Sequence, residues 1–420
     1  MSFAVFGSPI AHSKSPELFH TLFENFPYIR ISCDNPKQVK KLIFDLELEG
    51  ANLTSPLKKT ILPLLDEVDP LAKHLGSVNT IKRKGKKLFG YNTDTFGVAN
   101  SLKKMNLDVK NRRCLVLGSG GAAAAVCSQL GSAKDVVVVS RTIENAQALA
   151  ELFGFRTEHI GGVEKISASF DFIFYTLTKE AKNPIKIILP HQIFLDSNYS
   201  STKNSFAQNW LIFQALAAYE IFFESKLPPK SEEKLLDASD DIFYKKPVRS
   251  ISINGFMGVG KSTTCKLLAK ELSLKHIDLD DCIERKMMLK IESIFRNYGE
   301  EHFRKIESET LLEVLLERHC FCLATGGGTL ADSQNASLLK KQTFPIWLFS
   351  DIKTILSRVK NRKKRPLFSS DGRKLSSLYQ KRQQSYLANC HLAIDVRQLN
   401  KFQLCKKVMF ELFSIGFARE

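Results

Sequence analysis

The chain has 420 residues, a formal net charge of +17 and 44% hydrophobic residues, among them 30 phenylalanines. This length predicts two or three domains, and the apolar content argues against a disordered chain. The nine cysteines are scattered without paired spacing, which argues against a disulfide framework and favours a reducing compartment. We expect a cytoplasmic protein, because no targeting segment precedes the first apolar run, Phe3–Phe6, and no apolar segment has the length of a membrane span.

The positive charge could indicate nucleic-acid binding. The cationic runs at residues 82–87 and 362–365 are, however, typical of solvated loops, and anionic small substrates would also favour a positive surface. No known nucleic-acid-binding module is present. We therefore expect small-molecule partners, with no nucleic acid and no membrane, and keep a basic nucleic-acid-binding protein as the least favoured alternative.

Residues 1–100 alternate short apolar runs with amphipathic stretches, beginning with Phe3–Phe6 and continuing through residues 17–26, 28–32, 37–48 and 52–54. Such alternation predicts βαβ units and a largely parallel sheet. We expect this block to be a substrate-binding domain, joined later by a return helix at about residues 206–224.

Residues 101–205 restart the pattern and predict a Rossmann domain. After the strand at residues 114–117, the sequence GSGGAA fits the GxGxxG/A fingerprint and opens an alanine-rich helix, on whose free N–H groups a pyrophosphate can bind. The next strand, residues 136–139, ends without the acidic residue of an NAD site, and Arg141 can instead pair with a 2′-phosphate. We predict NADP(H), bound by these loop and strand-end residues: Gly118, Ser119, Gly120, Gly121, Ala122, Ser140, Arg141 and Thr142.

Residues 225–248 are polar and charged and contain two adjacent prolines, which predicts a linker. The block at residues 249–420 then opens with an apolar strand followed by GFMGVGKST at residues 255–263. This spacing is that of a phosphate-binding loop, in which Lys261 reaches the β- and γ-phosphates and the Ser262 hydroxyl coordinates Mg²⁺. The motif predicts ATP or GTP, bound by Gly258, Val259, Gly260, Lys261, Ser262 and Thr263.

The N-terminal half contains four further motifs: GSPIAHSKSP at residues 7–16, GANLTSPLK at 50–58, GSVNT at 76–80 and GYNTDTFG at 90–97. In these motifs and in their order, this half resembles the shikimate dehydrogenases. The resemblance implies that Ser13 and Ser15 bind the substrate carboxylate. It assigns ring hydroxyls to Asn52, Thr54, Asn79 and Asp94, further substrate contacts to Tyr199 and Gln214, and proton transfer to Lys58 beside Asp94. That chemistry is reasonable, because ketone reduction needs a proton for the developing alkoxide.

Two departures from the family pattern stand out. Tyr175 and Leu177 occupy positions near the nicotinamide where the family usually carries a short polar turn, and the segment between Tyr199 and Gln214 is shortened to residues 200–213. These departures keep an alternative open: an active kinase joined to a degenerate, redox-inactive dehydrogenase-like module that only binds shikimate.

The C-terminal block contains further motifs around residues 276–284, 294–307, 324–328, 365–367 and 382–386. In these motifs and in their order, the block resembles the shikimate kinases. The resemblance selects ATP as the nucleotide. It implies that Arg304, Gly327 and Arg382 bind shikimate and that Asp280 orients or deprotonates the attacking hydroxyl. Asp278 would serve Mg²⁺ together with Ser262, and Arg365 would neutralise the transferring phosphate from a lid.

Together these patterns predict an α/β chain with a βαβ substrate domain, a Rossmann NADP domain and a P-loop three-layer kinase domain with a parallel sheet. Shikimate would be the product of the first half and the substrate of the second. We therefore predict a bifunctional enzyme that reduces 3-dehydroshikimate with NADPH and phosphorylates shikimate with MgATP. The pattern makes no prediction of oligomeric state.

Overall fold

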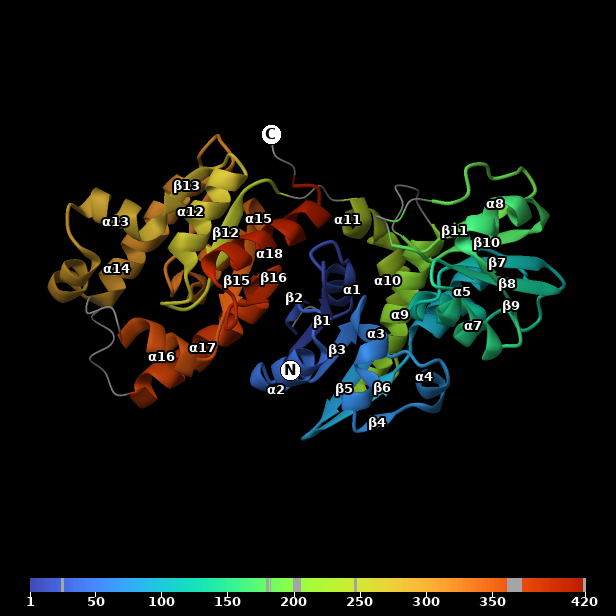
Figure 1. Ribbon diagram of the computed structural model, residues 1–420. Coiled ribbons are helices and arrows are strands. Elements are labelled where there is room, and N and C mark those ends of the chain that lie inside the picture. Colours follow the sequence, from blue (N-terminus) through green and yellow to red (C-terminus); the bar gives the residue numbers. More distant parts are fainter. Residues whose placement is uncertain are drawn as a thin grey trace. The chain divides into compact units, whose positions relative to one another are not determined.

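The computed structural model describes residues 1–23, 26–178, 181, 183–198, 205–244, 248–360 and 372–417. The chain forms two compact units, shown in Figure 1. The first unit contains residues 1–13, 26–34 and 246–420, and the second contains residues 14–25 and 35–245. The predicted domain boundaries do not coincide with these units, because the first two strands belong with the C-terminal block.

The first unit is built on a parallel sheet with the strand order β13-β14-β12-β15-β16-β2-β1. Strands β12 and β15 are buried along their whole length, as expected for a parallel sheet covered on both faces. Its strands are β1 (Phe3–Gly7), β2 (Tyr28–Ser32), β12 (Ile251–Asn254), β13 (Lys275–Asp278), β14 (Phe321–Ala324), β15 (Phe344–Phe349) and β16 (Leu392–Asp395). Its helices are α12 (Lys261–Glu271), α13 (Leu279–Met287), α14 (Ile291–Leu315), η4 (Thr329–Ala331), α15 (Ser333–Gln342), α16 (Ile352–Lys360), α17 (Gly372–Asn389) and α18 (Lys401–Ser414).

The second unit contains a mixed group of strands in the order β3-β5-β6-β4. The prediction of a largely parallel N-terminal sheet is wrong here, because β5 and β6 form an antiparallel hairpin that turns at Gly85, whose φ is +61°. The cationic run lies on this hairpin. Lys82 in it is buried and donates to the Phe222 carbonyl at 2.5 Å, so it does not extend into solvent. The strands are β3 (Gly50–Leu53), β4 (Glu67–Val68), β5 (Thr80–Lys84) and β6 (Lys87–Tyr91).

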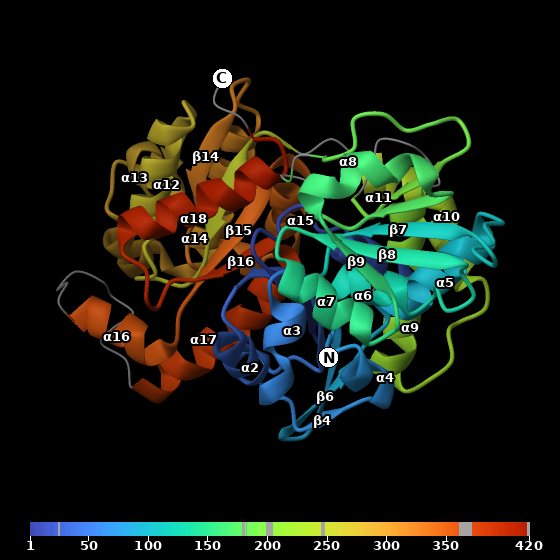
Figure 2. The same cartoon turned by 45° about the vertical axis from the view of Figure 1, so that its right-hand side comes forward.

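The Rossmann prediction is confirmed by a five-stranded parallel sheet in the order β11-β10-β7-β8-β9. Alternate residues of its strands enter two apolar clusters, so both sheet faces are buried. Helices α6 and α7 pack on one face and α8 on the other (Figure 2). The elements are β7 (Arg113–Leu117), α6 (Gly121–Cys127), β8 (Asp135–Ser140), α7 (Ile143–Glu151), β9 (Arg156–His159), η2 (Ile160–Gly162), α8 (Val163–Ile166), η3 (Ser167–Ser169), β10 (Phe172–Tyr175) and β11 (Ile193–Asp196).

The remaining helices of the second unit include the predicted return helix, α9 (Phe206–Phe223), which packs closely on α5 (Asp94–Lys104). A Cβ atom at Gly97 would lie 2.4 Å from Cδ1 of Trp210, so only glycine allows this approach. The others are α1 (Ser15–Leu22), α2 (Pro36–Asp45), α3 (Leu57–Thr60), η1 (Leu62–Leu64), α4 (Pro70–His74), α10 (Ser231–Asp237) and α11 (Ser239–Tyr244).

The stretch predicted as a linker, residues 225–248, contains the helices α10 and α11. Their apolar residues Leu235 and Ile242 are buried, which explains why a stretch of polar composition is folded. Among the helices that the structure describes, none combines the length and the apolar character needed to cross a bilayer.

Candidate active sites

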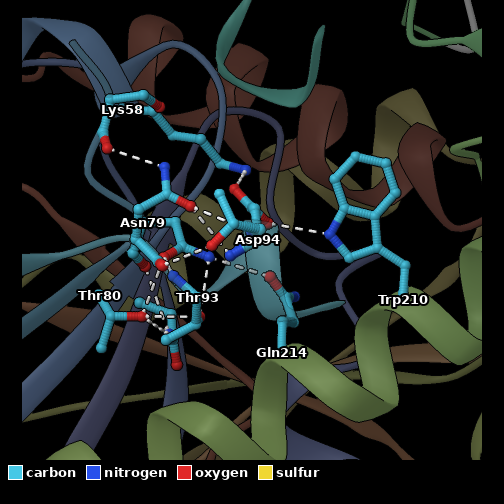
Figure 3. A network of polar contacts seen from close by, with 11 residues as sticks. Lys58, Asn79, Thr80, Thr93, Asp94, Trp210 and Gln214 are labelled. Atoms are coloured by element: carbon cyan, nitrogen blue, oxygen red, sulfur yellow. Dashed lines mark hydrogen bonds and ion pairs between the residues drawn. The ribbon is translucent and has the colours of Figure 1, made fainter. Parts of the chain in front are cut away.

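Lys58 and Asp94 form an ion pair in the second unit, with 2.5 Å between Lys58 Nζ and Asp94 Oδ2 (Figure 3). Lys58 lies on the short helix α3, and Asp94 is the first residue of α5. Asn92 positions the start of α5, because its Oδ1 accepts the backbone N–H of Asp94 at 3.0 Å. The Lys58 side chain is 18% exposed and the Asp94 side chain 3%, so the ammonium borders solvent while its partner is buried. A cation held in this way can deliver a proton to a bound molecule.

Asn79 is the centre of a polar network beside this pair (Figure 3). Its Nδ2 donates to Gln214 Oε1 at 3.0 Å, and its Oδ1 accepts the backbone N–H of Thr93 at 2.8 Å. Asn52 joins through its Nδ2, which donates to Thr80 Oγ1 at 3.0 Å. Two predicted hydroxyl-binding residues, Asn52 and Asn79, are thus brought together with Gln214, which was predicted as a further substrate contact. Thr54 lies just after β3 and is half-buried.

Three residues of this network were not predicted: Thr80, Thr93 and Trp210. The indole Nε1 of Trp210 donates to Asp94 Oδ1 at 3.2 Å, so the carboxylate is held by Lys58 on one oxygen and by the indole on the other. Thr80 and Thr93 lie inside motifs that were recognised, and their neighbours could have indicated them. Trp210 comes from α9, which is distant in sequence and carries no motif.

The glycine-rich loop lies directly beside the Lys58 helix. A Cβ atom at Gly121 would lie 3.1 Å from Cδ of Lys58, and Lys59 Nζ donates to the Ser119 carbonyl at 3.0 Å. Gly118 has a φ of +125°, and a Cβ atom there would lie 2.4 Å from Thr176 Oγ1, so this turn requires glycine. A Cβ atom at Gly120 would meet open space, and Ala122 follows in the first turn of α6. The loop therefore packs against Lys58 at Gly121 and is open at Gly120.

The residues that end β8 have the character predicted for the adenosine side of a dinucleotide. Ser140 is buried, and its Oγ accepts a hydrogen bond from Ser119 Oγ at 3.0 Å, which joins the strand end to the loop. Thr142 precedes α7, and its backbone N–H donates to Ser140 Oγ at 3.4 Å. Arg141 is exposed and makes no hydrogen bond or ion pair with a described residue. Its guanidinium is accordingly available for a phosphate.

Tyr175 and Leu177 belong to the apolar cluster on the α8 face of the five-stranded sheet. Tyr175 is buried and donates its hydroxyl to the Ala181 carbonyl at 2.9 Å, and burial raises the pKa of this phenol. These two residues therefore have a packing role. Tyr199, Arg365 and residues 200–204 of the shortened segment lie outside the described residues.

Ser13 and Ser15 are both buried. Ser13 is the last residue of segment 1–13 of the first unit. Its backbone N–H donates to the Ile10 carbonyl at 3.0 Å. Ser15 is the first residue of α1 in the second unit.

The phosphate-binding loop joins β12 to α12 in the first unit. Gly260 precedes α12 with a φ of +103°, a left-handed conformation that glycine adopts without strain. Lys261 begins the helix, and its Nζ donates to the Phe256 carbonyl at 3.3 Å. Gly258 also has a positive φ, of +85°, while Val259 is buried and anchors the loop. The hydroxyl-bearing Ser262 and Thr263 are exposed in the first turn of α12.

Three predicted shikimate-binding side chains converge on the turn Gly326–Gly328. A Cβ atom at Gly326 would lie 3.4 Å from Asp280 Oδ1, and one at Gly327 would lie 3.4 Å from Arg382 Nη1. A Cβ atom at Gly328 would lie 2.6 Å from Arg304 Nη2. The same Cβ at Gly327 would lie 3.5 Å from the Met257 backbone nitrogen of the phosphate-binding loop. The turn thus joins two arginines, a carboxylate and the phosphate-binding loop.

The two arginines differ in their partners. Arg304 is paired with the buried Glu307, with 2.6 Å between Nη1 and Oε2. Arg382 is 7% exposed and forms no ion pair with any described residue; its guanidinium lies 5.5 Å from the ring centroid of Phe256. Burial lowers the pKa of Arg382, and the neighbouring charge of Arg304 lowers it further. A buried cation without a counter-ion is costly, and a bound carboxylate would compensate its charge.

The donors for Mg²⁺ are few. Asp278 caps α13 by accepting the backbone N–H of Asp280 at 3.1 Å, and it is half-buried. No group of three or more His, Cys, Asp or Glu side chains with metal-site geometry occurs among the described residues. A single carboxylate with the Ser262 hydroxyl fits Mg²⁺, which usually keeps waters and takes other ligands from nucleotide phosphates.

The fold and these two sites define a chain that joins a dinucleotide-binding oxidoreductase to a P-loop kinase. Comparison with known families gives the particular assignment. The family model described as shikimate kinase matches residues 257–413. The models described as shikimate dehydrogenase substrate binding domain and shikimate / quinate 5-dehydrogenase match residues 5–81 and 100–186.

Individual relatives agree with the family models. A shikimate kinase of a Sulfurihydrogenibium species is 38% identical over 35% of this chain and 89% of its own length. A shikimate dehydrogenase (NADP(+)) of Aquifex aeolicus is 34% identical over 48% of this chain and 79% of its own length. A solved shikimate dehydrogenase in complex with NADP+ has 26% identity and a TM-score of 0.50, covering 58% of this chain and 96% of that one.

The chain therefore belongs to the shikimate dehydrogenase family in its N-terminal part and to the shikimate kinase family in its C-terminal part, and both resemblances seen in the sequence are confirmed. It spans 56% of the length of a Geobacillus dehydrogenase and 51% of one from Staphylococcus epidermidis.

Proposed function

We propose that this chain is a bifunctional enzyme of the shikimate pathway. Its N-terminal part reduces 3-dehydroshikimate to shikimate with NADPH, and its C-terminal part phosphorylates the 3-hydroxyl of shikimate with MgATP. The observation that carries the proposal is the convergence of Asp280, Arg304 and Arg382 on one glycine turn beside the phosphate-binding loop. Among the described residues, Arg382 has no ion-pair partner. The dehydrogenase half is supported by the Lys58–Asp94 pair in contact with the glycine-rich cofactor loop.

In the dehydrogenase half, bound NADPH supplies the hydride, and Lys58 supplies the proton to the developing alkoxide. Asp94 holds the Lys58 ammonium in place, while the Trp210 indole donates to the other carboxylate oxygen. The ring hydroxyls would be bound by Asn52, Thr54, Asn79 and Asp94, with further substrate contacts from Tyr199 and Gln214. The substrate carboxylate would be bound by Ser13 and Ser15. Arg141 with Ser140 and Thr142 would select the 2′-phosphate of NADPH.

In the kinase half, bound MgATP supplies the phosphoryl group. Arg304 and Arg382 would hold the shikimate carboxylate, and the backbone of Gly327 would approach the ring. Asp280 would orient the attacking hydroxyl and accept its proton. Lys261 and Arg365 would neutralise the negative charge on the phosphates, with Ser262 and Asp278 placed for Mg²⁺.

Variants in the two halves separate the activities. Lys58→Ala should abolish NADPH-dependent reduction and leave shikimate phosphorylation unchanged, with the exposed Lys73→Ala as a matched control. Lys261→Ala should abolish shikimate phosphorylation and leave NADPH-dependent reduction unchanged. If either variant keeps a near-normal rate in its own half, the assigned role is refuted.

Cofactor choice has its own test. Arg141→Ala should raise KM for NADPH and leave KM for NADH unchanged, because only NADPH carries the 2′-phosphate. An unchanged preference between the two cofactors would refute the assignment of Arg141.

A further inference from the structure

Strand β16 of the kinase part pairs in parallel with β2, near the N-terminus of the dehydrogenase part. The pairs are Leu392 with Arg30, Ala393 with Ile31 and Ile394 with Ser32, and β2 pairs in turn with β1. Figure 1 shows β1 and β2 in blue beside the red-orange β15 and β16. Two dehydrogenase strands therefore extend the sheet of the kinase part within the first unit.

Glu411 reaches the same N-terminal segment from the last helix, α18. Its Oε2 accepts the backbone N–H of Ile10 at 2.7 Å and that of Ala11 at 2.9 Å, and its Oε1 accepts the Ser32 hydroxyl at 2.6 Å. Glu411 is 0% exposed and forms no ion pair with any described residue. Its buried charge is consequently stabilised by donors from the dehydrogenase part.

The amphipathic pattern of α18 makes this placement unusual. Leu404, Val408 and Leu412 form the buried stripe of the helix, while Phe402 and Phe410 are exposed. Glu411 lies on the buried stripe, where an apolar residue would be expected. A glutamate there is costly unless its carboxylate meets hydrogen-bond donors, and the turn after β1 supplies them.

The turn that Glu411 holds leads directly to Ser13. Arg30, which is 3% exposed, holds its other end, because its Nε and Nη2 donate to the Ser13 carbonyl at 2.8 and 2.5 Å. Arg30 Nη1 also donates to the His391 carbonyl, at 3.4 Å, just before β16. The start of segment 10–13 is thus held by Glu411, which belongs to the kinase part. Its end is held by Arg30, which contacts the kinase part through His391.

We propose that Glu411 is a positioning residue for the dehydrogenase reaction: by holding the amides of Ile10 and Ala11, it fixes the turn that leads to Ser13, the residue proposed above to bind the substrate carboxylate. A side chain of the kinase part then holds a segment of the dehydrogenase part in place within the first unit. This inference rests on the function proposed above for the N-terminal half. Loss of Glu411 weakens shikimate binding in that half and leaves the phosphate-binding loop and the Gly326–Gly328 turn unaltered.

The test uses the full chain and compares Glu411→Ala with Glu411→Gln. The glutamine can keep its Oε1 on the two amides and donate its Nε2 to Ser32 Oγ, so it should retain the positioning. The alanine leaves two buried N–H groups without an acceptor. The matched control is Glu313→Ala, an exposed glutamate on α14 that pairs with Lys286.

In NADP⁺-dependent oxidation of shikimate, Glu411→Ala should raise KM for shikimate about 10- to 100-fold with a smaller change in kcat. Glu411→Gln should stay within about threefold of the wild type, and the phosphorylation constants should not change in either variant. Equal KM values for Glu411→Ala, Glu313→Ala and the wild type would overturn the proposal.

Hydrogen exchange provides a readout that does not depend on activity. The amides of Ile10 and Ala11 should exchange at least about tenfold faster in Glu411→Ala than in the wild type or Glu411→Gln. If the wild type does not oxidise shikimate, the proposed dehydrogenase function fails, and the exchange rates alone decide whether Glu411 holds the turn. If Glu411→Ala does not fold, Ser32→Ala is tested in its place, because it removes one of the three donors to Glu411. Its KM for shikimate should lie above that of the wild type and below the rise expected for Glu411→Ala. An unchanged KM together with unchanged exchange rates would contradict the proposal.

Discussion

Replacing Arg382 by methionine should weaken the kinase and stabilise the fold at the same time. Arg382 is 7% exposed and forms no ion pair with a described residue, so its guanidinium carries a desolvation cost that a bound carboxylate would offset. Methionine has a similar length and no charge. The variant therefore separates the contribution of Arg382 to binding from its contribution to stability, and the two should have opposite signs.

The size of each effect follows from the contacts. A planar guanidinium can donate two charge-assisted hydrogen bonds to a carboxylate, each contributing about 1.5–3 kcal/mol. Arg304 remains in place and retains part of the binding, so we expect a loss of about 3–4 kcal/mol, a roughly 100- to 1000-fold fall in kcat/KM for shikimate. For the fold, relief of the buried charge exceeds the loss of about 1 kcal/mol from the cation–π contact with Phe256.

Kinase kinetics and thermal unfolding without ligand measure the two effects. The unfolding temperature of Arg382→Met should rise by about 2–4 °C for a net gain of about 1 kcal/mol. Arg397→Met is the contrasting control, because Arg397 pairs with the buried Asp395 at 2.5 Å and its loss leaves that carboxylate without its cation; its unfolding temperature should fall. Arg318→Met, at an exposed position, should change neither quantity. An Arg382→Met variant with unchanged kcat/KM would show that Arg382 does not bind the shikimate carboxylate, and a lowered unfolding temperature would show that its buried charge does not destabilise the fold.

Three further predictions concern single interactions. Trp210→Phe removes the indole donor to Asp94 and should lower kcat of the dehydrogenase about tenfold without changing KM for NADPH; a normal kcat would exclude a positioning role for the indole. Gly118→Ala should cost about 2 kcal/mol of stability and abolish NADPH binding, because its φ is +125° and the added Cβ meets Thr176; calorimetric titration showing normal affinity would contradict this. Chelation with EDTA should stop phosphorylation, reversibly on adding Mg²⁺, while NADPH oxidation continues; loss of both activities would argue against separate metal dependence.

The features that could be predicted from the sequence are those specified by residues close together in the chain. The turn at Gly118 and the loop before Lys261 each combine a buried strand, glycines at fixed spacing and a helix start, so short-range sequence specifies both loop and setting. The same holds for the fold class, because buried β-branched runs such as Val136–Val139 alternate with helices.

Long-range pairing was not predictable in the same way. Strands β2 and β16 are both short and mostly apolar, and neither sequence indicates that the other strand is its neighbour in the sheet. Trp210 reaches Asp94 only because α9 packs on α5 at Gly97, a contact between segments more than 100 positions apart. Arg382 has no ion-pair partner within the part of the chain that the structure describes, and this depends on every side chain around it. A short sequence motif does not contain that information.

The central claim, that one chain both makes and phosphorylates shikimate, is tested most directly with 3-dehydroshikimate and NADPH in the absence of ATP. We expect loss of NADPH absorbance, faster than with NADH, followed by formation of shikimate 3-phosphate when MgATP is added. No NADPH consumption, with phosphorylation of added shikimate intact, would contradict it. That result would instead identify the N-terminal part as a redox-inactive shikimate-binding module.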